Sequence, residues 1–391
     1  QITKWLYRAL MENMPYDQFV RELVSPSPES EGFINGIKWR GNVNAAQSTE
    51  LQFAQNVGQV FLGVNLKCAS CHDSFIDDWK LTDSWGLAAV TADRELEIYR
   101  CDVPTGKIAA PAFLFPELGN IDPALPRKQR LDQLSRLVTN PRNNRLPRTL
   151  VNRLWQRLMG RGIVNPVDSM DAAPWSPELL DYLAAAFVDS GYDVRKLLRL
   201  IATSEIYQAR CMPPPEAHNG SGPTFSGPIA CRMTAEQFLD AVWRITGTTP
   251  NKADSVDAKK PSGAFDLRGD AAVRAAIMKC DLLMRSLGRP NREQVVTTRP
   301  DDLSTLEALD LTNGPTMADL LVRGAANLRK GNPDRSPDDT IAWLYCATLC
   351  RKPTAEELTV ARQMLGDPIT DDGLADLLWC LFELPEFQLV E

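Results

Sequence analysis

Apolar residues recur every three or four positions along most of the chain, a spacing that predicts amphipathic helices. Pro15 interrupts the first such pattern, so two short helices are expected over residues 2–24. A capping sequence at Ser48 predicts a helix over 48–62. Further helices are predicted over 79–90, 127–139, 145–159, 176–189, 193–205, 234–247, 270–286, 315–328, 337–349, 354–365 and 371–383.

Three stretches depart from helical spacing. Residues 95–116 combine short apolar runs with Pro and Gly, which predicts a small β-hairpin. Residues 211–230 are too rich in helix breakers for regular structure, and residues 248–268 are expected to form a second irregular insertion. The pattern as a whole predicts a mainly α protein.

Length and charge narrow the function classes. A chain of 391 residues exceeds one typical hydrophobic core, so two or three domains are expected. The net charge of −7 argues against nucleic acid or an anionic membrane as the main partner. No apolar run in the sequence reaches the roughly 18 residues that a membrane-spanning helix needs.

The chemistry of the chain is concentrated in the run Cys68-Ala69-Ser70-Cys71-His72. Such a C-x-x-C-H run is typical of covalent c-type haem attachment: two thiols form thioethers with the porphyrin, and the imidazole binds the iron. The chain has nine Cys and only two His, so this run rarely arises by chance. Two other interpretations stay open, namely a disulfide or redox pair at Cys68 and Cys71, and half of a zinc site.

The second axial position of the iron has several candidates. Met170 is the first choice, followed by Met212 and Met233, and His218 is the only other histidine. The methionines fit core packing equally well, and His218 fits an exposed loop. An empty sixth position would favour small-molecule or peroxide chemistry over electron transfer.

Trp79 and Arg153 are further candidates for contacts with haem. Trp79 fits the edge of the macrocycle, and a neighbouring carboxylate could accept the second N–H of His72. The same carboxylates could instead cap the helix that begins near Trp79. The guanidinium of Arg153, part of a basic stripe, matches a haem propionate, although local salt bridges explain the stripe as well.

A series of short motifs extends over nearly the whole chain. The motifs are MPYDQFVRE at 14–22, FLGV at 61–64, CASCHD at 68–73, DW at 78–79, NRLW at 152–155, GRGIV at 160–164, PELLD at 177–181, SEIYQ at 204–208, LGRP at 287–290, LTNG at 311–314 and RKPTAEEL at 351–358. In this order they resemble the planctomycete cytochrome-like (PSCyt-type) proteins of unknown function with their C-terminal companion (PSD-type) domain. Many members carry a second histidine where this chain has Ser74.

The resemblance implies two domains and an extracytoplasmic location. Residues 1–120 would form a cytochrome-like domain, incomplete at its N-terminus, that combines the C-x-x-C-H segment with the hairpin. Residues 121–391 would form the larger helical companion domain. Thioether attachment and lasting disulfides both belong outside the cytoplasm, so the protein is expected to be periplasmic or otherwise extracytoplasmic.

Two function classes follow. The first is a monohaem c-type cytochrome with one covalent haem c, which either exchanges electrons with a redox partner protein or forms the redox centre of an oxidoreductase acting on a small molecule. The alternative is a haem-free structural or binding module in which Cys68 and Cys71 form a disulfide.

Overall fold

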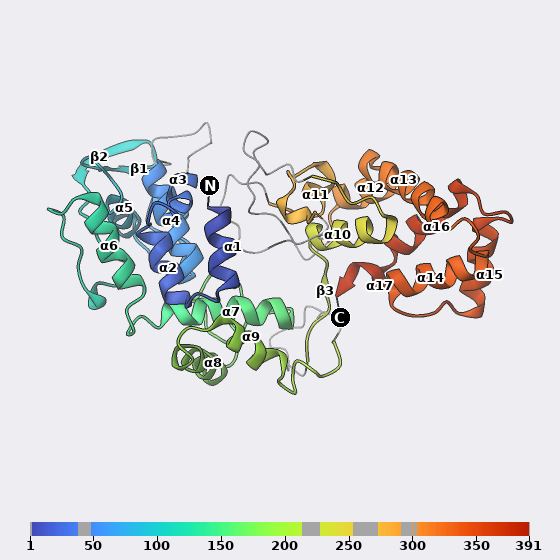
Figure 1. Ribbon diagram of the computed structural model, residues 1–391. Coiled ribbons are helices and arrows are strands. Elements are labelled where there is room, and N and C mark those ends of the chain that lie inside the picture. Colours follow the sequence, from blue (N-terminus) through green and yellow to red (C-terminus); the bar gives the residue numbers. More distant parts are fainter. Residues whose placement is uncertain are drawn as a thin grey trace. The chain divides into compact units, whose positions relative to one another are not determined.

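The computed structural model describes residues 2–37, 48–212, 227–252, 273–290, 299 and 303–390. Within these residues the protein is mainly helical, as predicted, with two small antiparallel sheets of two strands each. The chain divides into a first unit, Gln1–Ile229 with Arg292–Thr298, and a second unit, Ala230–Asn291 with Arg299–Glu391. In Figure 1 the first unit runs from blue to green and the second from yellow to red.

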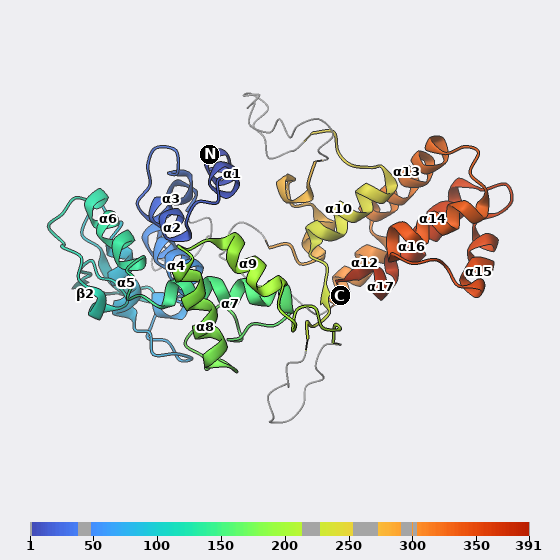
Figure 2. The same ribbon diagram turned by 60° about the horizontal axis from the view of Figure 1, so that its bottom comes forward.

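The first unit contains the N-terminal helices and the hairpin. Its elements are α1 (Thr3–Met11), α2 (Tyr16–Val24), α3 (Gly32–Gly36), α4 (Thr49–Leu62), η1 (Cys68–Ser70), α5 (Leu81–Ala89), β1 (Glu97–Arg100), β2 (Val103–Ile108), η2 (Pro116–Leu118), α6 (Arg127–Val138), α7 (Arg145–Met159), α8 (Pro177–Asp189) and α9 (Val194–Ala202). The two short helices on either side of Pro15 are confirmed, and so is the antiparallel hairpin of β1 and β2. Helix α8 packs on both α7 and α9 (Figure 2).

Residues on both sides of position 120 share this unit. Helix α6 packs against α2, and α7 packs against α4, so the segment after 120 completes the core of the segment before it. The expected boundary at 120 therefore does not coincide with a boundary between compact units. As a division between sequence domains it stays a prediction.

Helix α4 lies at the centre of the first unit and has a strong signal at each end. Its N-terminus is capped by the Ser48 side chain, which accepts from the amide of Leu51 at 3.3 Å. It ends at Gly63, whose φ of 60° lies in the left-handed region. A Cβ on Gly63 would lie 2.3 Å from Cγ of Met170, so only glycine fits there.

The second unit is built from the C-terminal helices and one short sheet. Its elements are β3 (Cys231–Arg232), α10 (Ala235–Thr246), η3 (Ala275–Ile277), α11 (Leu282–Ser286), α12 (Thr305–Asn313), α13 (Pro315–Gly331), α14 (Pro337–Leu349), α15 (Ala355–Leu365), α16 (Asp371–Glu383), α17 (Pro385–Gln388) and β4 (Leu389–Val390). Strands β3 and β4 pair antiparallel, and α16 packs on α13, α14 and α15. Of the two expected insertions, residues 213–226 and 253–268 lie outside the described residues.

The continuous helix predicted over 270–286 is wrong for the described part of that range. The structure has the single turn η3 and the short helix α11 instead. Asp281 starts α11 as a new helix, because its carboxylate accepts from the amide of Met284 at 2.7 Å.

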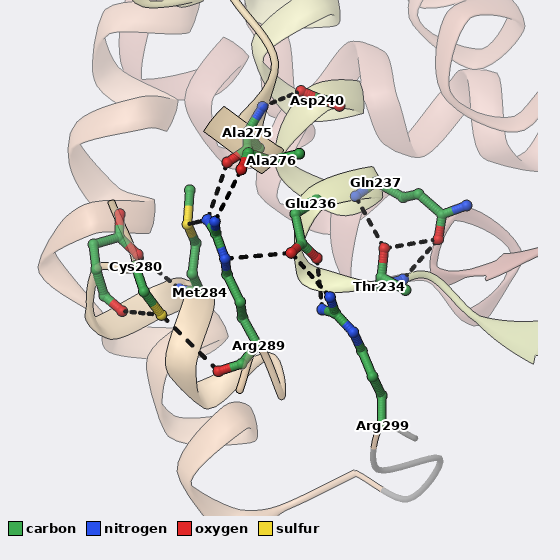
Figure 3. A network of polar contacts seen from close by, with 11 residues as sticks. Thr234, Glu236, Gln237, Asp240, Ala275, Ala276, Cys280, Met284, Arg289 and Arg299 are labelled. Atoms are coloured by element: carbon green, nitrogen blue, oxygen red, sulfur yellow. Dashed lines mark hydrogen bonds and ion pairs between the residues drawn. The ribbon is translucent and has the colours of Figure 1, made fainter. Parts of the chain in front are cut away.

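Arg289 binds the backbone of the single turn η3. Its guanidinium donates to the carbonyl groups of Ala275 and Ala276 at 3.0 and 3.1 Å, as Figure 3 shows. The same side chain pairs with Glu236, which also accepts two hydrogen bonds from Arg299 at 2.6 and 3.0 Å. The Ala275 carbonyl thus accepts from Arg289 in addition to the backbone amide of Met278, which donates to it at 3.1 Å.

Arg351 links the starts of α15 and α17 in the second unit. Its side chain donates to both carboxylate oxygens of Glu357 at 2.8 Å and to Glu386 at 2.6 and 2.9 Å. Glu357 also completes a capping box with Thr354 at the N-terminus of α15. The hydrogen bonds from Arg351 lower the pKa of Glu357 to about 2.

We expect Glu357→Gln to weaken the second unit in a pH-dependent way. Because the folded pKa lies below the unfolded value, ionised Glu357 stabilises the fold above pH about 4.5, and this contribution is lost as the pH falls toward about 2. Urea unfolding should therefore show a gap between wild type and variant at neutral pH that narrows in acid. Glu356→Gln on the same turn is the control, and an equal gap at every pH would contradict the prediction.

Candidate cofactor site

The C-x-x-C-H run forms one tight turn of backbone. The amides of Cys71 and His72 both donate to the carbonyl oxygen of Cys68, at 3.0 and 3.1 Å. Residues three and four positions apart on such a turn share a face. Cys68, Cys71 and His72 are accordingly partly exposed, whereas Ala69 and Ser70 are fully buried. The turn thus leaves Cys68, Cys71 and His72 partly accessible, while Cys71 also packs against the core of the unit.

Ser70 fixes the inward side of this turn. Its hydroxyl donates to the carbonyl of Leu66 at 2.8 Å, accepts from the amide side chain of Gln55 at 2.8 Å and contacts the hydroxyl of Ser84 at 3.0 Å. The indole of Trp85 donates to the Ser70 carbonyl at 3.2 Å. These contacts tie the turn to α4 and α5 inside the core.

These supporting residues were not predicted as site residues. Ser70 occupies one of the two variable positions of the motif, and Gln55 lies 15 residues away from it in sequence. The available signal was a glutamine on the apolar face of α4, because a buried amide needs a partner.

The hairpin supports the turn from its other end. The amide of Cys101 donates to the carbonyl of Cys71 at 2.8 Å. Cys101 lies at the bend between β1 and β2, with a φ of 53° in the left-handed region. Tyr99 on β1 stacks on Trp85, with ring centroids 6.2 Å apart. The predicted hairpin therefore has a specific function, which is to hold the Cys71 end of the motif.

The imidazole of His72 contacts the backbone next to it. Its Nδ1 lies 2.7 Å from the backbone oxygen of Asp73. A carbonyl oxygen only accepts, so in the neutral imidazole this contact favours the tautomer with the proton on Nδ1 and the lone pair on Nε2. This is the tautomer that a metal-ligating histidine needs. In this structure Nδ1 contacts a peptide carbonyl, and a carboxylate partner for His72 stays a prediction.

The carboxylates after the motif organise the backbone. The Asp73 carboxylate accepts a hydrogen bond from the backbone amide of Leu81, the first residue of α5, at 2.9 Å. Asp77 accepts from the amide of Trp79 at 3.2 Å, and Asp83 accepts from that of Lys80 at 2.8 Å. The capping interpretation is therefore confirmed, although the helix begins at Leu81 and not at residue 79.

Two large apolar side chains stand out in the loop beside His72. Phe75 is 87 % exposed and Ile76 is 76 % exposed, and the Phe75 ring lies 4.5 Å from the imidazole, measured between centroids. Phe75 and Ile76 therefore form a small exposed apolar surface beside the imidazole.

Trp79 contacts two residues from later in the first unit, Phe115 and Asp171. Its indole donates to Asp171 at 3.0 Å, and its ring meets Phe115 edge to face with centroids 5.9 Å apart. Asp171 in turn accepts from Arg145. These partners hold Trp79 in place, and its predicted contact with a haem edge stays a prediction.

Arg153 supports the C-terminal end of α4. Its guanidinium donates to the backbone carbonyls of Gln59 and Val60 and pairs with Asp168 at 3.2 Å. Carbonyl groups at a helix C-terminus lack helical partners, so a cation there is stabilising. The predicted contact with a propionate stays a prediction, and the observed partners of Arg153 are structural.

Met170 is placed beside the same end of α4. Its amide donates to the carbonyl of Gly63 at 2.9 Å, and its sulfur lies 3.5 Å from the amide nitrogen of Asn152. The structure thus brings Met170 and Arg153 to one end of α4. The role of Met170 as an iron ligand stays a prediction.

The other candidates for the sixth ligand lie elsewhere in the chain. Met212 pairs with Ile229 in the first unit, and Met233 packs against the core of the second unit. His218 lies outside the described residues. Within the described ranges, no three side chains of His, Cys, Asp and Glu gather into a metal-ion site.

The described helices include none with the length and apolar character of a membrane span. This finding agrees with the absence of a transmembrane segment in the sequence pattern.

Two family models match the chain in sequential order. The PSCyt2 model, a protein of unknown function (DUF1549), matches residues 1–95, and the PSD1 model, a protein of unknown function (DUF1553), matches residues 129–365. No curated protein and no solved structure gave a match. The chain belongs to the planctomycete PSD1 family and carries the cytochrome-like PSCyt2 domain ahead of it.

Proposed function

We propose that the chain binds one haem c covalently through Cys68 and Cys71, with His72 as an axial ligand, and acts outside the cytoplasm as a c-type redox protein. The observation that supports the proposal is the tight turn on which Cys68, Cys71 and His72, three and four residues apart, are all partly exposed. The His72 hydrogen bond to Asp73 adds to it, because it leaves Nε2 available for a metal.

Each part of the site has a distinct task in this proposal. Cys68 and Cys71 form the thioether links, and His72 donates its Nε2 lone pair. Phe75 and Ile76 would offer exposed apolar surface to the haem. The buried network at Ser70 keeps the turn rigid. Haem, when bound, supplies a one-electron iron couple, suited to electron transfer or to the redox centre of an oxidoreductase.

The test is haem retention after expression in cells with a c-type maturation system. Wild type should keep its haem through denaturation and solvent extraction, and the pyridine haemochrome should show two thioether links. Cys68→Ala/Cys71→Ala should lose all covalent haem. Cys101→Ala is the matched control, because this exposed cysteine lies beside the same turn but outside the motif, and it should retain haem in full.

The reverse outcome would identify the alternative function. A colourless wild-type chain, with Cys68 and Cys71 joined by a disulfide in mass spectrometry, would overturn the cytochrome proposal and establish the haem-free binding module. His72→Ala separates attachment from ligation: the covalent haem should remain, and the absorption bands of the axial imidazole should be lost.

A further inference from the structure

A cleft in the first unit is lined by residues outside the C-x-x-C-H turn. Its volume is about 350 Å³, and its walls include Phe115, Glu117 and Met170, together with Arg142 just before α7 and Arg145 and Arg148 in its first turn. Clefts of this size hold small molecules. Neither the family match nor the proposed haem attachment assigns it an occupant.

The lining of the cleft includes three arginines and one carboxylate, that of Glu117. Arg145 pairs with Asp171 and Arg148 with Asp181, but neither aspartate belongs to the described lining. Arg142 forms no ion pair with any residue that the structure describes. An anion that enters the cleft therefore meets, in Arg142, a guanidinium that has no carboxylate partner among the described residues.

One of these arginines is held rigidly. The guanidinium of Arg145 lies over the Phe115 ring, 5.7 Å from its centroid, and the Asp171 carboxylate fixes it from another side. Asp171 also accepts from Trp79, so the cleft wall is braced by the loop that follows the motif. A donor that is already fixed loses little conformational freedom when a ligand binds.

The apolar residues of the walls indicate that the ligand is an organic molecule and not an inorganic ion. Phe115, Met170 and Leu180 contribute apolar surface next to the guanidinium groups. Inorganic ions would leave this surface wet, whereas an organic molecule would cover it. The planar fork of arginine matches carboxylate geometry.

We propose that this cleft binds a small organic carboxylate. The carboxylate has two chemically equivalent sources, a free small molecule and a propionate of the proposed haem. The inference does not rest on haem attachment, because the cleft and its arginines are complete in the chain itself.

The first test uses the haem-free wild-type chain and isothermal titration calorimetry. D-glucuronate is the probe and D-glucose its neutral match, since the two differ by the carboxylate. Glucuronate should bind with a Kd of about 1 mM or tighter and weaken with salt, and glucose should not bind. Absence of glucuronate binding, or equal binding of both sugars, would overturn the proposal.

Variants identify the cleft as the binding place. Arg142→Gln/Arg148→Gln should weaken binding at least about tenfold, because hydrogen bonds to charged groups are lost. Glu117→Gln should strengthen binding about threefold by removing a like charge, a gain that misfolding cannot mimic. Arg136→Gln on α6, which breaks an exposed pair with Asp132, is the control and should leave affinity unchanged. A loss in Arg136→Gln equal to that of the double variant would overturn the assignment.

The haem-loaded chain then distinguishes the two sources. Equal affinity with and without haem supports a free carboxylate as occupant, and loss of glucuronate binding on loading supports a propionate. Both results support the proposal that the cleft binds a carboxylate. If the chain takes up no haem, the haem-free titrations still decide the proposal.

Discussion

Trp85→Ala should lower the free energy of unfolding of the first unit by about 3–5 kcal/mol, the usual loss for a buried tryptophan. Trp85 is only 1 % exposed and is among the largest fully buried side chains. The substitution removes its packing, its stacking on Tyr99 and its hydrogen bond to Ser70. The C-x-x-C-H turn should loosen with it, because Trp85 binds the backbone of that turn.

Urea unfolding measures this loss of stability. Amide exchange in α4 and α5, recorded alongside, shows that the loss occurs in the first unit. Trp175→Ala is the matched control. Trp175 lies in the same unit and is 41 % exposed, so its removal should lower the free energy of unfolding far less. Trp85→Phe keeps most of the volume and isolates the indole hydrogen bond, with an expected loss of about 1–2 kcal/mol. A Trp85→Ala loss no larger than that of the control would refute the central role of this side chain.

Arg232→Met should destabilise the second unit by about 3–5 kcal/mol, because it leaves a buried carboxylate without its counter-ion. The Glu307 side chain is 7 % exposed and accepts from both terminal nitrogens of Arg232, at 2.9 and 2.7 Å. One of these nitrogens also donates to Gln388 at 3.2 Å. The pair joins β3 to α12 within the core of the unit.

Two comparisons make this expectation specific. Arg329→Met breaks an exposed pair with Asp371 in the same unit and should cost about 0–1 kcal/mol. The double variant Arg232→Met/Glu307→Leu removes both charges and should recover much of the loss. Equal urea midpoints for Arg232→Met and Arg329→Met would contradict the argument.

The same buried pair explains why α12 was not predicted. Helices were recognised by apolar residues at helical spacing, and most of them begin and end as expected. In α12 the buried positions are Glu307 and Leu311, while Leu306 and Leu309 are exposed. A helix that buries a glutamate against Arg232, 75 residues earlier, shows no apolar stripe. Its one local signal is Ser304, whose side chain caps the helix.

The site was predictable where its chemistry is local in sequence. Cys68, Cys71 and His72 are adjacent, so the motif alone identifies them. Their support is distant, since Trp85 and the Cys101 amide belong to other elements. The two carbonyl partners of Arg153 also depend on the fold, because they lie more than 90 residues away in sequence. Sequence pattern reveals reactive groups, and tertiary packing decides what holds them.

The anchored turn at residues 68–72 has a consequence for the entropy of attachment. Fixing a flexible backbone costs about 1–2 kcal/mol per residue, so ordering five residues on arrival of a ligand would cost about 5–10 kcal/mol. Here the Ser70 network and the Cys101 amide order the turn during folding. Only side-chain rotations of Cys68, Cys71 and His72 remain to be fixed when a partner binds. A flexible peptide of the same sequence would bind the same group more weakly.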